Sequence, residues 1–249
     1  MTLGVDKLNK EKLPSAVEMP VELWVNEVKI TTFMCTPYDL EDLAIGHLLT
    51  RGMISDISKV KDVTVNEDTY QIFLNTTENV SHPLYSVPEF VLSGASAVGE
   101  FSDNIYKIPS INSDYAVELE IIVDIAHTMI KEAIIYNTTG GVHGAVISNA
   151  NSYFLREDIG RHNAVDKAVG AAARQNIDFF NSFICTTGRI SLDMLLKSAA
   201  IRIPVVASLK YPSDMGVRLA NHYNIAIVSR ITSNEPSIYA NEERIILNK

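Results

Sequence analysis

The run Arg156-Glu-Asp-Ile-Gly-Arg-His-Asn-Ala-Val-Asp-Lys167 joins a predicted strand to a predicted helix. It gathers cations, anions and an imidazole around one glycine, and small residues follow it from 164 to 173. The first backbone N–H groups of a helix have no intrahelical partner, and the helix dipole is positive there. The run therefore predicts an anion-binding site at a helix N-terminus. A structural cluster of salt bridges is the alternative interpretation.

Strands and helices alternate regularly on both sides of this run. We expect strands at 142–148, 153–156, 183–187, 203–208 and 225–229, and helices at 163–174, 191–200 and 213–222. Strands separated by helices of about ten residues indicate a layered α/β domain, in which ligands bind at loops beyond the strand C-termini. The loops 186–189, 208–210 and 230–237 are polar or contain glycine, so they are candidate walls of such a site.

The first half of the chain predicts a smaller, β-rich portion. We therefore expect an N-terminal portion at 1–112 and the α/β domain at 113–249. Alternating residues predict one hairpin at 21–34 and another at 63–74. Between them, Thr36, Pro37 and Asp39 are cap signals for a helix that ends at Gly52. Residues 75–112 are expected to be irregular, and one long helix is expected at 118–136.

The composition limits the classes of function. The chain has 249 residues and a formal net charge of −9, which argues against broad binding of nucleic acid or of an anionic membrane but allows a local basic pocket. No stretch approaches the roughly 20 apolar residues of a membrane span, so membrane insertion is not expected. The N-terminus has no apolar signal-peptide core, and the cysteines are only Cys35 and Cys185. These features predict a cytoplasmic protein.

Two more motifs stand at junctions between helices and strands. In Thr138–Gly144, adjacent glycines allow a ligand to approach the backbone, although a helix C-cap and a turn would also need them. His143 in that motif lies on a strand, where a lone histidine is more often packed than catalytic. In Thr187–Ser191, Arg189 offers a bidentate fork for phosphate or carboxylate, and Ser191 is suited to cap the next helix.

Together these motifs closely resemble the FdhD family of formate dehydrogenase accessory sulfurtransferases. The resemblance rests on residues 139–143, 156–167 and 188–191, and it continues in order from about residue 18 to 245. It implies a cytidine-deaminase-like, three-layer α/β domain with a smaller N-terminal portion. It also implies that the protein accepts persulfide sulfur from a cysteine desulfurase. The sulfur would pass to the molybdenum cofactor, bis-molybdopterin guanine dinucleotide, before insertion into formate dehydrogenase.

The resemblance also implies the site residues and the partners. Phosphates would be held by the backbone of Gly140, Gly141 and Gly160 and by cationic side chains, and the pterin or guanine would be oriented by polar side chains of the central run. The predicted cofactor-binding residues are Gly140, Gly141, His143, Asp158, Gly160, Arg161, His162, Asn163, Asp166, Lys167, Gly188, Arg189, Ser191, Lys197 and Arg230. A homodimer is expected, guanine nucleotide should mimic the cofactor, and no zinc or other metal site is expected.

The sequence departs from the family at its sulfur-carrying loop, whose pattern is Cys-Gly-x-Cys-Gly. Here Ser93 and Ser96 occupy the cysteine positions. A serine hydroxyl cannot form a persulfide, and its pKa is too high to replace a thiolate. Whether the chain is an enzyme therefore stays open, and the alternative is a non-catalytic module that binds and delivers the cofactor. Cys185 is a substitute thiol to consider, although a buried strand cysteine is the commoner case.

A second loop also departs from the family pattern, and the motifs of three other enzyme classes are missing from the sequence. The family tends to have a glycine- and arginine-bearing loop after the last core strand, but residues 231–237 contain neither, and only Arg230 is retained. Zinc deaminases need His-x-Glu and Pro-Cys-x-x-Cys, which the chain lacks. No Gly-x-Ser-x-Gly elbow supports a serine hydrolase at Ser93 or Ser96. A nucleotide phosphohydrolase has the least support, because there is no P-loop or acidic metal-binding cluster.

Overall fold

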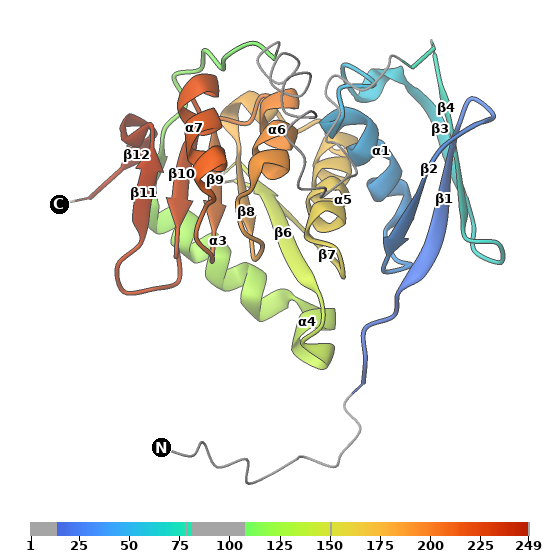
Figure 1. Cartoon of the computed structure of the whole chain (residues 1–249), viewed down its shortest axis with the longest axis horizontal. Coiled ribbons are helices and arrows are strands. Elements are labelled where there is room, and N and C mark those ends of the chain that lie inside the picture. The colour runs from blue at the N-terminus through green and yellow to red at the C-terminus, as the bar shows by residue number, and fades with distance from the viewer. Residues whose placement is uncertain (1–13, 78, 81–107, 150, 249) are drawn as a thin grey trace, which may run out of the picture.

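The computed structural model describes residues 14–77, 79–80, 108–149 and 151–248 (Figure 1). Within these ranges the strands form a four-stranded, a six-stranded and a two-stranded sheet. Helices pack against the sheets, so the chain is a mixed α/β protein, as the alternating pattern predicts. Ser93 and Ser96 lie outside the described residues.

The four-stranded sheet has the order β2-β1-β4-β3. Its strands are β1 (Met19–Val25), β2 (Val28–Cys35), β3 (Val60–Asn66) and β4 (Gln71–Thr76). Both predicted hairpins are confirmed, since β1 pairs with β2 and β3 with β4 in antiparallel register. Asn26 and Glu27 form the first tight turn with positive φ angles, the conformation that favours two-residue hairpin connections.

Helix α1 (Leu40–Thr50) follows this first hairpin, and its predicted start is wrong. The helix begins after Asp39, which has left-handed backbone angles and no side-chain cap hydrogen bond. Thr36 does not cap it because the backbone N–H and the hydroxyl of Thr36 donate to the carboxylate of Asp158. The predicted end is confirmed, since Gly52 follows the helix with a φ of 63°.

The six-stranded sheet has the order β11-β10-β9-β8-β6-β7. Its strands are β6 (His143–Ser148), β7 (Tyr153–Asp158), β8 (Phe183–Thr186), β9 (Val205–Ser208), β10 (Ala226–Ser229) and β11 (Ser237–Ala240). Strands β8, β9 and β10 are parallel and entirely buried, as is typical of strands covered on both faces. Three strands are missing from the sequence prediction: β11, and the pair β5 (Val117–Glu118) and β12 (Ile245–Ile246).

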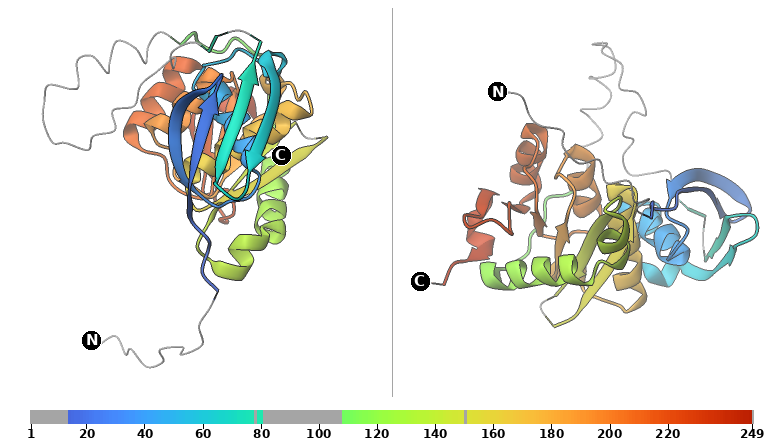
Figure 2. Two further views of the ribbon diagram at one scale, coloured as in Figure 1. Left: turned by 90° about the vertical axis from the view of Figure 1, so that its right-hand side faces the viewer. Right: turned by 90° about the horizontal axis from the view of Figure 1, so that it is seen from below.

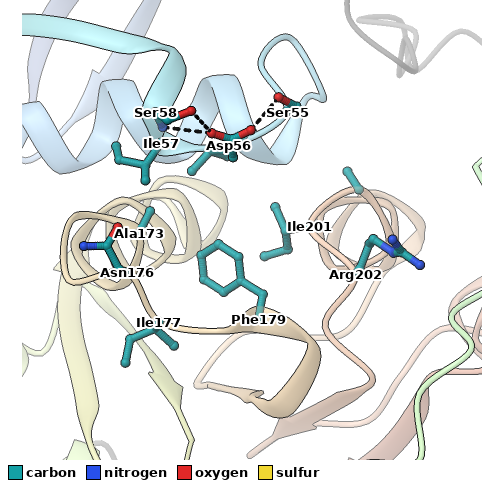
Figure 3. Close-up of a pocket in the computed structure, with 12 residues that line it drawn as sticks. Ser55, Asp56, Ile57, Ser58, Ala173, Asn176, Ile177, Phe179, Ile201 and Arg202 are labelled. Atoms are coloured by element: carbon teal, nitrogen blue, oxygen red, sulfur yellow. Dashed lines mark hydrogen bonds between the residues drawn. The ribbon is translucent and has the colours of Figure 1, made fainter.

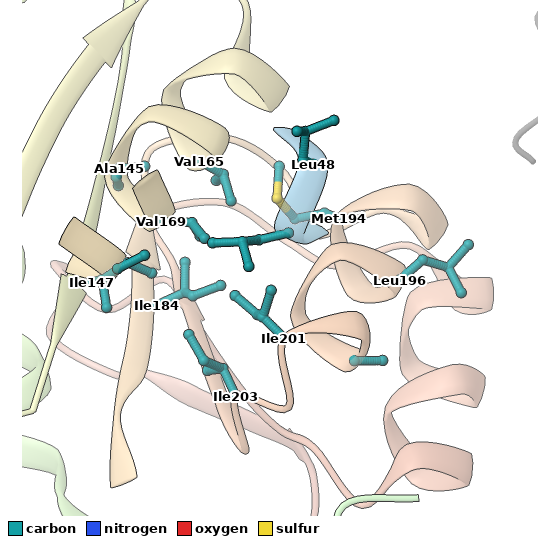
Figure 4. Packing of buried hydrophobic residues seen from close by; sticks show 14 of the residues in the cluster. Leu48, Ala145, Ile147, Val165, Val169, Ile184, Met194, Leu196, Ile201 and Ile203 are labelled. Carbon is teal, nitrogen blue, oxygen red and sulfur yellow. The ribbon is translucent and has the colours of Figure 1, made fainter. Parts of the chain in front are cut away.

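Helices cover both faces of the six-stranded sheet, which makes three layers (Figure 2). Helices α5 (Arg161–Arg174), α6 (Leu192–Ala200) and α7 (Asp214–Tyr223) pack on one face, where Val169, Ile184 and Ile203 meet (Figure 4). Helix α3 (Leu119–Glu132) packs on the other face, with Ala126 and Met129 against Cys185 and Val205. The three helices predicted at 163–174, 191–200 and 213–222 are therefore confirmed.

The single helix predicted at 118–136 is wrong, because the structure has two helices there. Helix α3 ends at Glu132, and α4 (Ile134–Thr139) starts after Ala133, which has an extended ψ of 91°. The Glu157 carboxylate accepts hydrogen bonds from the backbone N–H groups of Ile135 and Tyr136. This carboxylate satisfies N–H groups at the start of α4, so the break costs little.

The two predicted portions of the chain share one hydrophobic core. One cluster contains Leu23 of β1, Leu43 of α1 and Ile184 of β8. Helices α1 and α5 are in backbone contact, because a Cβ atom on Gly46 would overlap the Asp166 carbonyl and one on Gly170 would overlap the Asp42 carbonyl. The boundary at residue 112 stays a prediction. None of the described helices is long and apolar enough to cross a membrane.

Candidate functional site

The predicted loops meet at one edge of the six-stranded sheet. Strands β7, β8, β9 and β10 end at this edge, and the antiparallel β6 begins there. Backbone hydrogen bonds continue past the strands, from Thr187 N to Gly144 O at 3.0 Å and from Leu209 N to Thr186 O at 3.1 Å. The motifs at 138–144, 156–167 and 187–191 are thus neighbours in space.

A pocket of about 410 Å³ opens at this edge. Helices α3 and α4 supply apolar residues, among them Met129 and Ala133, and the sheet edge supplies Gly140–Gly144, Thr187 and Lys210. Ligand pockets typically combine an apolar lining with a few placed polar groups. Of the predicted site residues, Gly140, Gly141 and His143 line it.

His143 is held at the mouth of the edge pocket by Thr187. Its Nδ1 lies 3.0 Å from Thr187 Oγ1, and that oxygen accepts a hydrogen bond from Gly144 N at 3.1 Å. The Thr187 hydroxyl is then free to donate to Nδ1, which leaves the proton of the neutral ring on Nε2. Burial lowers the pKa of His143, and the charges of Arg161, His162 and Lys210 lower it further. The imidazole is therefore a neutral group among cations.

Arg161 begins helix α5 and packs across the 187–189 loop. A Cβ on Gly188 would lie 2.9 Å from Arg161 Cβ, so only glycine leaves room for this side chain. Arg161 Nε is buried and has no hydrogen-bond partner. Among the described residues, neither Arg161 nor the exposed Arg189 forms a salt bridge. These guanidinium groups are suited to hold phosphate oxygens.

His162 is fixed by an acid that the sequence interpretation missed. Its Nε2 lies 2.8 Å from Asp193 Oδ2, and its Nδ1 is buried without a partner. Ser191 precedes α6 as predicted, but its hydroxyl oxygen accepts no cap hydrogen bond from the helix backbone, and the hydroxyl donates to Asp193 Oδ1. Asp193 lies in the first turn of α6, two residues after Ser191, and this spacing was its only sequence signal.

Asp158 and Lys167 turn inward and bind the N-terminal portion. Lys167 Nζ lies 2.7 Å from Asp158 Oδ2, with both side chains fully buried, and it donates to Thr36 O at 3.0 Å. The other carboxylate oxygen of Asp158 accepts from Gly160 N at 2.8 Å and from Asn163 Nδ2 at 3.1 Å. These predicted residues therefore join the β2–α1 connection to the start of α5.

Asp166 and Lys197 form a second buried pair, with Nζ–oxygen distances of 2.6 and 2.7 Å. Thr50 donates to the same carboxylate at 2.7 Å, and His47 Nδ1 lies 3.3 Å from it. Burial opposes the charge of Asp166, but Lys197 and His47 hold its pKa well below the usual range. The ammonium group of Lys197 is therefore bound to Asp166 in the described structure. Its predicted contact with phosphate stays a prediction.

The predicted backbone cradle for phosphate is also occupied internally. Gly140 N donates to Tyr136 O at 2.7 Å, Gly141 N to Thr139 Oγ1 at 3.2 Å and Gly188 N to Thr186 Oγ1 at 3.1 Å. Gly160 N is taken by Asp158. The structure thus shifts the anion-binding capacity from the glycine N–H groups to the side chains. The exposed Lys210, which the sequence interpretation also missed, is one of these.

Two further predicted positions lie near the edge or in the core. Arg230 follows β10, and its guanidinium carbon lies 5.6 Å from the centroid of the Tyr211 ring. Cys185 is fully buried in the layer between the sheet and α3, and burial raises the pKa of its thiol strongly. Burial also raises the pKa of Cys35, to about 12. Neither cysteine is a thiolate at neutral pH.

A second pocket, of about 400 Å³, lies away from this edge (Figure 3). It is lined by the ends of α1, α5 and α6, with Phe179 and Ile201 pointing into it and Asp56 and Arg202 at its sides. None of the predicted cofactor-binding residues lines it. The edge pocket is therefore the candidate site.

Known proteins match the chain over nearly its full length. A family model described as the FdhD/NarQ family matches residues 16–246. The sulfur carrier protein FdhD of Staphylococcus aureus strain MRSA252 is 30% identical over 233 residues, which cover 92% of this chain and 88% of the relative. The protein of the same name in strain JH9 is 31% identical over 234 residues, with the same shares covered.

A solved structure matches the fold as well. It is the crystal structure of a protein from Desulfotalea psychrophila that is provisionally described as a formate dehydrogenase accessory protein. The TM-score is 0.74 at 26% sequence identity, and the match covers 93% of this chain and 90% of the other.

Proposed function

The chain belongs to the FdhD/NarQ family, and from this premise we propose that it is an accessory protein of formate dehydrogenase. Its cargo is the molybdenum cofactor, bis-molybdopterin guanine dinucleotide, which binds at the sheet edge beside Arg161. The relatives' names support the accessory and sulfur-carrier role. A homodimer, a cytoplasmic location and a cytidine-deaminase-like fold label belong to the same proposal.

One observation supports the binding step most directly. The buried Nε of Arg161 has no protein partner, and Arg189 and Lys210 form no salt bridge among the described residues. An orphaned buried donor is rare unless a ligand or water satisfies it. The cargo carries two pyrophosphate groups, so its charge is complementary to these cations. The adjoining apolar pocket suits a flat ring system.

In this proposal the residues of the edge bind and orient the cargo. Arg161 and Arg189 hold phosphate oxygens, and Gly188 keeps the space into which Arg161 extends. His143, with Nδ1 tied to Thr187, presents Nε2–H as a hydrogen-bond donor. The sulfur comes from a cysteine desulfurase, and formate dehydrogenase receives the loaded cofactor.

Guanosine diphosphate binding, measured by calorimetry, tests the binding step. Arg161→Gln and Arg189→Gln should each weaken the affinity about tenfold, the value of one lost charge-assisted hydrogen bond. Arg202→Gln is the matched control, because Arg202 stacks on Phe180 at the far end of α6 and should leave the affinity unchanged. Absence of binding to the wild-type protein would refute the proposed cargo site.

A second candidate is a module that binds and delivers the cofactor without carrying sulfur itself. The serines at 93 and 96 and the two buried cysteines favour it, because both thiols are protonated at neutral pH. Mass spectrometry after incubation with a cysteine desulfurase and cysteine separates the candidates. A gain of one sulfur atom on Cys185 supports sulfur carriage, and an unchanged mass supports the binding module.

A further inference from the structure

Glu157 belongs to the central run Arg156–Lys167, and its side chain binds helix α4. Its Oε2 accepts from Ile135 N at 3.0 Å and its Oε1 from Tyr136 N at 2.7 Å. Each carboxylate oxygen therefore takes one of the N–H groups that the first turn of a helix leaves without an internal partner. Helix α4 has only six residues and follows the break at Ala133, so this contact from β7 fixes where the helix begins.

The other end of α4 is fixed by Gly140. This glycine has a φ of 66°, in the left-handed region, and its N–H donates to Tyr136 O at 2.7 Å. The backbone N–H and the carbonyl of Tyr136 are therefore both engaged within the protein. What this residue can offer a ligand is its side chain.

Tyr136 is the residue through which α4 contributes to the edge pocket. Of the six residues of this helix, all of them described, it alone lines the pocket, next to Ile130 and Ala133 of the preceding segment. Among the described lining residues it is also the only Phe, Tyr or Trp, and it is 41% exposed. The pocket of about 410 Å³ falls within the range of about 300–1,000 Å³ that is typical of ligand sites.

We propose that Tyr136 is the stacking platform for the guanine ring of the cargo, and that Glu157 is the positioning residue that holds this platform through the backbone of α4. Stacking of a base on a flat aromatic ring adds affinity without hydrogen bonds to the base. Lys210 and His143 line the same pocket and supply a cation for the neighbouring phosphate and a hydrogen-bond donor for the base. This inference rests on the proposed function and names the base subsite within it.

Calorimetry with two probes, guanosine diphosphate and inorganic pyrophosphate, separates the base from the phosphates. Tyr136→Ala should weaken the binding of guanosine diphosphate about tenfold, the value of one lost stacking contact, and leave pyrophosphate binding unchanged. Tyr136→Phe keeps the ring and should keep the wild-type affinity for both probes. Tyr153→Ala is the matched control, because Tyr153 is 40% exposed but does not line the edge pocket.

A double-mutant cycle with the same probes tests the role of Glu157. Glu157→Gln places an amide NH₂ group against a backbone N–H of α4 and should weaken the binding of guanosine diphosphate about threefold, with pyrophosphate binding unchanged. The double variant with Tyr136→Ala should bind no more weakly than Tyr136→Ala alone, because Glu157 acts through that ring. Glu132→Gln is the matched control, since Glu132 ends α3, binds Tyr153 and does not line the pocket.

The outcomes for the inference and for the proposed function are distinguishable. Wild-type affinity of Tyr136→Ala for guanosine diphosphate would overturn the inference, and so would an equal loss of pyrophosphate binding, since a structural effect moves both probes. Wild-type affinity of Glu157→Gln, or additive losses in the cycle, would overturn the positioning role. If Glu157→Gln does not fold, the Tyr136 variants decide alone. All these results leave the proposed function intact, whereas a wild-type protein that does not bind guanosine diphosphate would sink both.

Discussion

The run Arg156–Lys167 has two sides that differ in how its charges are used. On the inner side, Arg156, Asp158, Asp166 and Lys167 all have partners, and each belongs to a cluster that includes residues of the N-terminal portion. Arg156 lies 2.7 Å from Asp42, and Asp166 accepts from Thr50 at 2.7 Å. On the outer side, Arg161 and His162 each keep a buried nitrogen without a partner.

The comparison shows that a dense polar motif is not one functional unit. Paired charges on the inner side lie at the contact between α1 and α5, whereas Arg161 at the sheet edge forms no salt bridge among the described residues. Whether a charged side chain has a partner inside the protein thus separates the two interpretations of the sequence, an anion site and a structural salt-bridge cluster. The structure shows the salt-bridge cluster on the inner side of this helix start, and the anion site on its outer side stays a prediction.

The largest effect is expected from adding a methyl group on the inner side. Gly170→Ala places a Cβ atom onto the Asp42 carbonyl, and neither helix backbone is free to move away. Overpacking commonly costs 1–3 kcal/mol, and a backbone overlap exceeds that range. The variant should fail to fold, as judged by circular dichroism. Gly141→Ala is the control, because its Cβ would meet atoms no closer than 3.4 Å and should leave folding unchanged.

A smaller loss is expected when one inner charge is removed. Lys167→Met leaves the buried Asp158 carboxylate without its cation, and breaking such a pair costs about 3 kcal/mol or more. Urea unfolding should show this as a lower midpoint. On the outer side, the exposed Arg189→Met should weaken nucleotide binding and move stability by less than about 0.5 kcal/mol. A urea midpoint equal to that of the wild type for Lys167→Met would contradict the stabilising role of the inner charges.

The sequence patterns predicted the hairpins and the alternating second half because these depend on local periodicity. They failed where tertiary contacts override local preference. The break at Ala133 depends on Glu157, more than twenty residues away, and the start of α1 depends on Asp158. Strands β5 and β12 are only two residues each, too short to carry a pattern.

For the site, the sequence motifs identified residues that lie near one another in the structure. They could not show which of these residues have partners inside the protein. Arg161 and Lys197 look alike as cations in a motif, yet one has an unpartnered buried nitrogen and the other lies 2.6 Å from Asp166. Only the packing of α1 against α5 decides between them, and no spacing rule contains that information. Asp193 escaped notice for the same reason, since its partner His162 is thirty-one positions away.

The smallest expected effect is the pH dependence of nucleotide affinity, which tests whether His143 on the outer side senses the bound anion. Burial lowers the pKa of His143, the charges of Arg161, His162 and Lys210 lower it further, and the charge of Asp158 raises it. A bound phosphate offsets those cations and raises the His143 pKa, so the complex holds more protons than the free protein. Affinity for guanosine diphosphate should therefore rise as pH falls from 8 to 6, by less than about threefold, which is the limit that half a pKa unit sets once the pH lies below both pKa values. The terminal phosphate titrates near pH 6 in either case, so the signal is the difference from His143→Gln, which should show the weaker slope. Equal slopes would mean that His143 does not sense the bound anion, and the outer side would then consist of the arginines and His162 alone.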